Sequence, residues 1–129
     1  MALPRLHCVS GAVDVADILT TVAAANTLVK ADKSKRYKIV DVALRAIGGD
    51  ASASSTIEVT NGVEVAWAAT TTNVDEDVIM RADTTNVVAT HLGHWGEGDT
   101  PIALIRTGIE TATATSIDYV VHYLVEGCN

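Results

Sequence analysis

The sequence predicts an all-β protein, a single antiparallel β-sandwich or jelly roll of about eight short strands. Three observations support this fold class. Val and Thr recur through the chain, and such β-branched side chains fit a pleated sheet better than a helix surface. Apolar and polar residues alternate over several short segments that turn signals separate. No long segment has the apolar spacing of a helix, which leaves a sandwich or a barrel.

The chain has 129 residues, a length that fits one domain. We therefore expect one jelly-roll domain over 1–129, in which residues 1–11 form an N-terminal arm. A chain this long buries roughly two-thirds of its unfolded surface, so it needs no metal or disulfide to fold. The spacing of Cys8 and Cys128 matches no zinc motif. Two free thiols are expected in a reducing compartment, and a disulfide between the termini is the alternative.

The clearest strand signal runs from Arg36 to the Gly48-Gly49 pair. A helix is the competing interpretation, because Asp41 and Arg45 are four residues apart, but the β-branched run and the glycine stop favour a strand. Alternation places Val40, Val42 and Leu44 on one face. It places the following residues on the other face: Tyr37, Ile39, Asp41, Ala43 and Arg45.

A β-hairpin is predicted next, with arms over 56–60 and 63–67 around Asn61-Gly62. Asn-Gly between two alternating segments predicts a two-residue type I′ turn, since both residues tolerate positive φ. Glu58 and Glu64 fall on the exposed faces of the arms. The apolar residues expected to face each other are Ile57, Val59, Val63, Val65 and Trp67.

Four further strands are predicted at 26–30, 86–90, 101–107 and 116–125. Two segments are ambiguous: 12–28 fits a short helix or an edge strand, and 75–81 fits a strand slightly better than a helical turn. In the last strand, one face takes Ile117, Tyr119, Val121, Tyr123 and Val125, and the other takes Asp118, Val120, His122 and Leu124.

The second faces of the strands at 37–45 and 117–125 are too apolar for open solvent. We expect either Tyr37, Ile39 and Ala43, or else Val120 and Leu124, to contact a neighbouring subunit. Trp95 is a further candidate contact, because Trp is enriched at protein interfaces. These six residues are the interface candidates of the sequence.

The formal net charge is −7, which argues against a partner that is a nucleic acid. Five of the nine basic residues cluster at Lys30, Lys33, Lys35, Arg36 and Lys38. A solvated loop explains this cluster best, and a patch that meets an acidic partner is the alternative. No signal peptide or membrane-spanning stretch is visible, so we expect synthesis in the cytoplasm and no membrane contact.

The segment from His91 to Asp99 is the one place where chemistry-bearing residues gather. His91, His94 and Glu97 could be ligands of a metal in a cupin-like enzyme, but the His-x-x-His spacing in a glycine-rich loop fits no common metal motif. Trp95 could stack on a sugar ring. A polar loop with turn glycines is the favoured interpretation. No nucleophile elbow or phosphate-binding loop is present either, so we expect no enzyme, cofactor or metal.

The order of the segments resembles that of small jelly-roll proteins encoded in the structural gene clusters of tailed bacteriophages. The segments that carry the resemblance are Val13–Leu19, Tyr37–Arg45, Ser55–Val59, Gly98–Ile105 and Ser116–Val125. Several proteins of that family are capsid decoration (cement) proteins, which sit as trimers on the outer shell. The resemblance implies a homotrimer on the virion surface that binds the major capsid protein, and it implies no catalytic residues. A carbohydrate- or receptor-binding module of a phage tail or spike is the alternative function.

Overall fold

A computed structural model describes residues 4–51, 55–62, 64–70, 75–82, 87–89, 91–108 and 114–127. The eight strands are β1 (Arg5–Asp14), β2 (Thr27–Val29), β3 (Lys35–Ile47), β4 (Ser55–Thr60), β5 (Val65–Thr70), β6 (Val87–Val88), β7 (Ile102–Gly108) and β8 (Ser116–Gly127). Two short 3-10 helices, η1 (Val15–Asp17) and η2 (Ala24–Asn26), lie between β1 and β2. The helical turns of the described residues include none that is long and apolar enough to cross a membrane.

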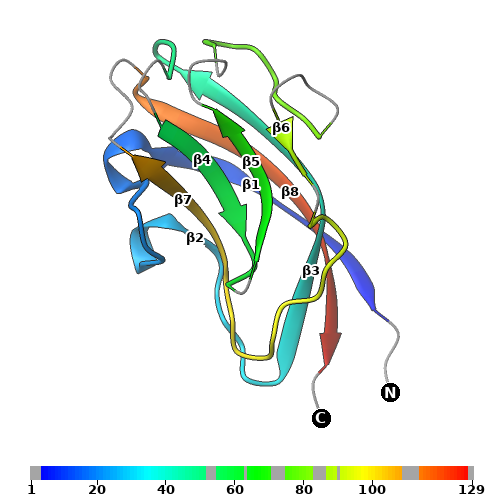
Figure 1. Ribbon diagram of the computed structural model, residues 1–129. Helices are drawn as coiled ribbons and strands as arrows, with labels where there is room; N and C mark the ends of the chain where they lie inside the picture. The colour runs from blue at the N-terminus through cyan, green and yellow to red at the C-terminus, as the bar shows by residue number, and fades with distance from the viewer. Residues whose placement is uncertain are drawn as a thin grey trace.

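The strands form two antiparallel sheets that pack face to face (Figure 1). One sheet has three strands in the order β1-β8-β3, and the other has five in the order β2-β7-β4-β5-β6. The predicted all-β sandwich of about eight strands is therefore confirmed.

The strand pairs are nested along the chain, as in a long hairpin that has been wrapped into two layers. β1 pairs with β8, β2 with β7, and β4 with β5. The free edge of β3 is bridged by the segment 75–82, through Leu44 with Met80 and Ala46 with Glu76. This wrapped-hairpin pattern is the jelly roll.

The core lies between the inner faces of the two sheets. The three-stranded sheet contributes Val42, Leu44, Ile117 and Val121, which are at most 1% exposed. The five-stranded sheet contributes Ile57, Val59, Trp67, Ile102 and Leu104, all fully buried. Burial of one such side chain stabilises the fold by about 1.5–3 kcal/mol, so these two rows hold the layers together.

A β-bulge in β3 changes which residues face the core. The pairing with β8 passes from Ile39 opposite Tyr123 directly to Asp41 opposite His122, so Val40 is the extra residue. Tyr37 and Ile39 therefore lie on the same face as Val42 and Leu44, and they are 4% and 0% exposed. The prediction that put them on the opposite face, as interface candidates, is wrong.

Tyr37 is held in the core by polar as well as apolar contacts. Its hydroxyl donates a hydrogen bond to the Lys30 carbonyl at 2.8 Å. Its ring meets Tyr123 edge-on, with the centroids 5.7 Å apart. Burial raises the pKa of Tyr37 above its usual value, since the charged phenolate is poorly solvated there.

The predicted faces of β8 are confirmed. Ile117, Val121 and Tyr123 are buried, and Tyr119 and Val125 pack against the same core. Tyr119 has room because its neighbour on β1 is Gly11, where an added Cβ would lie 2.9 Å from the Tyr119 hydroxyl. Val120 lies on the outer side and is 37% exposed.

The predicted hairpin exists as β4 and β5, but its connection differs from the expected two-residue turn. Thr60 pairs with Val65, so four residues, 61–64, connect the strands. The described part of this connection is closed by hydrogen bonds in which the Asn61 N–H donates to the Glu64 carbonyl and the Glu64 N–H donates to Asn61 Oδ1. Asn61 is 1% exposed and does not have the positive φ expected of it, so it acts through its buried side chain.

Two other segments differ from expectation. The segment expected to be an N-terminal arm is mostly strand, because Arg5 to Gly11 belong to β1 and pair with β8. The segment 75–81 is neither regular strand nor helix and only bridges the edge of β3. Cys8 is an exposed free thiol on β1, and Cys128 lies outside the described residues.

Candidate interaction surface and the histidine loop

The outer face of the three-stranded sheet is the first candidate surface, which we call the outer face. The pairing register sets three rows across it: Ala12, Asp118 and Arg45; Ser10, Val120 and Ala43; and Cys8, His122 and Asp41. Leu6 and Leu124 follow in the next row. Three of the remaining interface candidates, Ala43, Val120 and Leu124, thus lie on one face of the molecule, although the sequence had left Ala43 as an alternative to the other two.

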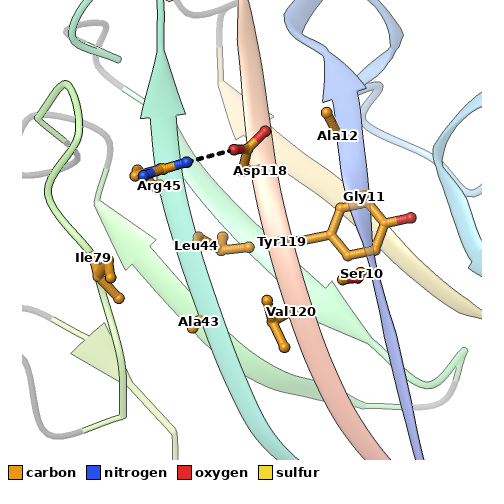
Figure 2. Close-up of a pocket in the computed structure, with 10 residues that line it drawn as sticks. All are labelled: Ser10, Gly11, Ala12, Ala43, Leu44, Arg45, Ile79, Asp118, Tyr119 and Val120. Carbon is orange, nitrogen blue, oxygen red and sulfur yellow. Dashed lines mark hydrogen bonds and ion pairs between the residues drawn. The ribbon is translucent and has the colours of Figure 1, made fainter.

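A hollow of about 500 Å³ opens in this outer face (Figure 2). Its centre is Val120, flanked by the short side chains of Ser10 and Ala43. The hydrogen-bonded pair Arg45–Asp118 lies at one end, and Ile79, which is 59% exposed, lies on the β3 side. Small residues beside larger apolar ones leave a depression that an apolar side chain of a partner can fill.

The charges of the outer face are paired within it. Arg45 bonds Asp118 at 2.9 Å, Arg36 bonds Glu126 at 2.9 Å, and Arg81 bonds Asp41 at 2.7 Å. Such exposed pairs contribute little stability, about 0–1 kcal/mol each. Their electrostatic consequence is larger, because three acids of this face are each paired with an arginine although the chain carries a net charge of −7.

β1 is an exposed edge strand that borders the outer face. Among the described residues its sheet partner is β8 alone, and eight of its ten residues are exposed. Exposure on both faces means that the five-stranded sheet covers little of β1, apart from Val13, which is buried. The outward backbone groups of a long edge strand are a template for pairing with another chain.

The loop that follows β6 packs onto the edge of β3. The Gly93 N–H donates to the Ile39 carbonyl and the Gly96 N–H to the Tyr37 carbonyl, both at 2.8 Å. Trp95 forms a bridge with Lys38. The Trp95 ring is contacted by Arg36 and Lys38, each 4.9 Å from the ring centroid. A sugar that stacks on this half-buried Trp would compete with these two cations for the ring.

A tight turn brings the two histidines of this loop together. The His94 N–H donates to the His91 carbonyl at 3.3 Å, and Gly93 between them has φ of +83°, as the third residue of a type II turn requires. The two imidazole centroids are 5.1 Å apart. The His-x-x-His spacing fits no helical metal motif, but in this turn it places His91 and His94 next to each other.

The carboxylate beside the histidines is Glu64 and not Glu97. Glu64 Oε2 lies 2.8 Å from His94 Nδ1, and one ligand atom from each of Glu64, His91 and His94 can be chosen so that all lie within 4.8 Å of one another. Glu97 is exposed, and its carbonyl accepts a hydrogen bond from the Thr100 hydroxyl. No sequence pattern marks Glu64 as a partner of the histidines, because it belongs to the hairpin connection 27 residues before His91.

No protein-family model matches this chain, and no curated protein matches it either.

Proposed function

We propose that this chain is a structural protein that associates with copies of itself, and that it serves as a capsid decoration (cement) protein of a bacteriophage. The observation that supports self-association best is the outer face, where Val120 and Ile79, 37% and 59% exposed, line an open hollow. Leu6, which is 64% exposed, lies two rows away on β1. Exposed apolar side chains gathered on one face of a small domain favour a protein partner.

The pairing of charges favours a second copy of this chain as the partner. Two molecules with a net charge of −7 repel each other over most of their surfaces. The outer face avoids this repulsion, since Asp118, Asp41 and Glu126 are each bonded to an arginine. Apolar contact can then form there at the least electrostatic cost.

The layout of the outer face suits a three-fold ring. A cyclic trimer is held by contacts in which two different patches of each subunit meet. The two borders of the outer face offer such patches, with Leu6 on edge strand β1 at one side and Ile79 on the segment 75–82 at the other.

Light scattering coupled to gel filtration tests the self-association. We expect a mass three times the 13.5 kDa of one chain. Val120→Asp, which adds a carboxylate beside Asp118, should give a folded monomer. Val88→Asp is the matched control, because Val88 is 58% exposed but lies on β6 in the other sheet, and this variant should remain trimeric. A monomeric wild-type protein, or equal effects of the two variants, contradicts this part of the proposal.

The virion role needs its own experiment. Particles made from a genome with this gene deleted should assemble, bind added wild-type protein, and resist heating less than particles that carry it. The Val120→Asp protein should bind these particles more weakly than Val88→Asp. Absence of the protein from purified wild-type particles contradicts the virion role and leaves self-association unaffected.

A further inference from the structure

We propose that Glu64, His91 and His94 bind one divalent transition-metal ion, of the class of Zn²⁺, Co²⁺ or Ni²⁺. Two imidazoles and one carboxylate form a ligand set that such ions accept in proteins. The three side chains come from two connections that the fold brings together, the hairpin connection 61–64 and the turn 91–94. This inference does not depend on the proposed virion role.

The hydrogen bond of His91 fits a metal ligand. Its Nδ1 lies 3.2 Å from the Val65 carbonyl, which can only accept, so Nδ1 carries the proton and the lone pair is on Nε2. Metal-binding histidines usually have this arrangement, in which a backbone carbonyl holds the non-ligating ring nitrogen and orients the ring.

The backbone around the cluster is fixed by a buried side chain. Asn61 Oδ1 accepts from the Glu64 N–H at 3.0 Å, and Asn61 Nδ2 donates to the His94 carbonyl at 3.2 Å. One residue therefore connects two of the ligand-bearing positions. Pre-positioned ligands lose less conformational entropy on binding, which favours a site over a chance gathering of exposed groups.

The side chains need only small movements to complete the site. Ligand atoms around a tetrahedral ion lie about 3.3–3.5 Å apart, given bonds of about 2.0–2.2 Å. One ligand atom of each side chain now lies within 4.8 Å of the other two, so the side chains must turn to reach this spacing, and the Glu64–His94 hydrogen bond must open as both groups turn to the ion. His91 and His94 are exposed and Glu64 is half-buried, so no core contact opposes these rotations.

The position of the cluster assigns the ion a structural role. Glu64 belongs to the β4–β5 hairpin of the five-stranded sheet, whereas the histidine turn is bonded to β3 of the three-stranded sheet through Gly93 and Gly96. A bound ion would cross-link the two layers at this end of the sandwich. The hollow on the outer face contains none of the three ligands, which favours a clamp over a reaction centre.

Calorimetric titration with ZnCl₂ after treatment with EDTA tests the proposal. We expect saturable binding of one ion per chain, and a higher melting temperature with Zn²⁺ than with EDTA. His91→Ala, His94→Ala and Glu64→Gln should each weaken binding at least tenfold and abolish the rise in melting temperature. Co²⁺ should give the visible absorption of four- or five-coordinate cobalt when bound to the wild type, and should not give it with any of these three variants.

Two variants serve as controls. Glu97→Gln removes the other acid of the loop, and His122→Ala removes a histidine on the outer face; both should bind Zn²⁺ as the wild type does. Melting curves in EDTA show whether each variant is folded before it is titrated. The proposal is overturned by absence of saturable binding, by binding that survives replacement of both His91 and His94, or by an equal loss in His122→Ala.

Discussion

Replacement of Asn61 by alanine tests how far one buried amide connects the two loops. The change removes the hydrogen bonds to the Glu64 N–H and the His94 carbonyl. Each such hydrogen bond contributes about 1 kcal/mol net to the free energy of unfolding. If the group that remains is buried and water cannot replace the lost partner, the loss of stability is larger, about 1–3 kcal/mol. Since Asn61 is 1% exposed while Glu64 and His94 are partly solvated, we expect Asn61→Ala to lower the free energy of unfolding by about 2–3 kcal/mol.

Urea denaturation measures this loss as a lower midpoint with an unchanged m-value. Asn26→Ala is the matched comparison, because Asn26 is fully buried and also makes two side-chain bonds, from the Ala23 N–H and to the Thr21 carbonyl. Both variants should lose similar stability, but only Asn61→Ala should shift the NMR signals of the His94 ring. If Asn61→Ala stays within about 0.5 kcal/mol of the wild type while Asn26→Ala does not, the amide does not stabilise the loops as argued here.

Three further predictions follow from the structure. Gly62→Ala should lower the midpoint of urea denaturation more than Gly93→Ala. Both residues have positive φ, but a Cβ at Gly62 would lie 2.6 Å from Thr100, whereas one at Gly93 meets nothing within 4 Å. Equal effects of the two variants would show that Thr100 moves away from the new Cβ at no cost in stability. Ile39→Ala should destabilise the isolated subunit by about 2–5 kcal/mol in thermal and urea melts, as for a core residue; a loss seen only in the oligomer would restore the prediction that Ile39 is an interface residue. Burial raises the pKa of Glu58, so the folded protein binds a proton at Glu58 more tightly than the unfolded chain does. The stability that results is present below the ordinary pKa of 4.5 and is lost as the pH rises through the pKa of Glu58 in the folded protein. Glu58→Gln should therefore be more stable than the wild type at neutral pH, and this difference should shrink in acid when melts are compared across pH. A difference in stability that does not change with pH would contradict the effect of burial on Glu58.

The strands could be predicted from the sequence where alternation is strong and uninterrupted. β8 is such a case, since a strict period of two separates Ile117 and Val121 in the core from Val120 outside. β3 was located correctly, but its first half was assigned to the wrong face. A bulge at Val40 shifts Tyr37 and Ile39 by one position, and no residue type marks it in the sequence.

The candidate sites were less predictable because they depend on tertiary pairing. His91 and His94 stood out as a pair, whereas Glu64 joins them only because the hairpin connection meets the histidine turn in space. The apolar residues of the outer face were recognisable, but their shared location depends on β8 lying between β1 and β3. Periodicity within a segment carries no information on which segments become neighbours.

The pairing of β1 with β8 also has a consequence for synthesis of the protein. β1, the first strand of this domain, pairs with β8, its last, since Arg5 lies opposite Val125 and Val13 opposite Ile117 (Figure 1). Until β8 has been synthesised, β1 and β3 lack the strand that joins them. Non-local pairing of this kind slows folding to milliseconds or seconds. We therefore expect this sheet to form only after β8 has been synthesised, so β1 and β3 must be protected from aggregation until then.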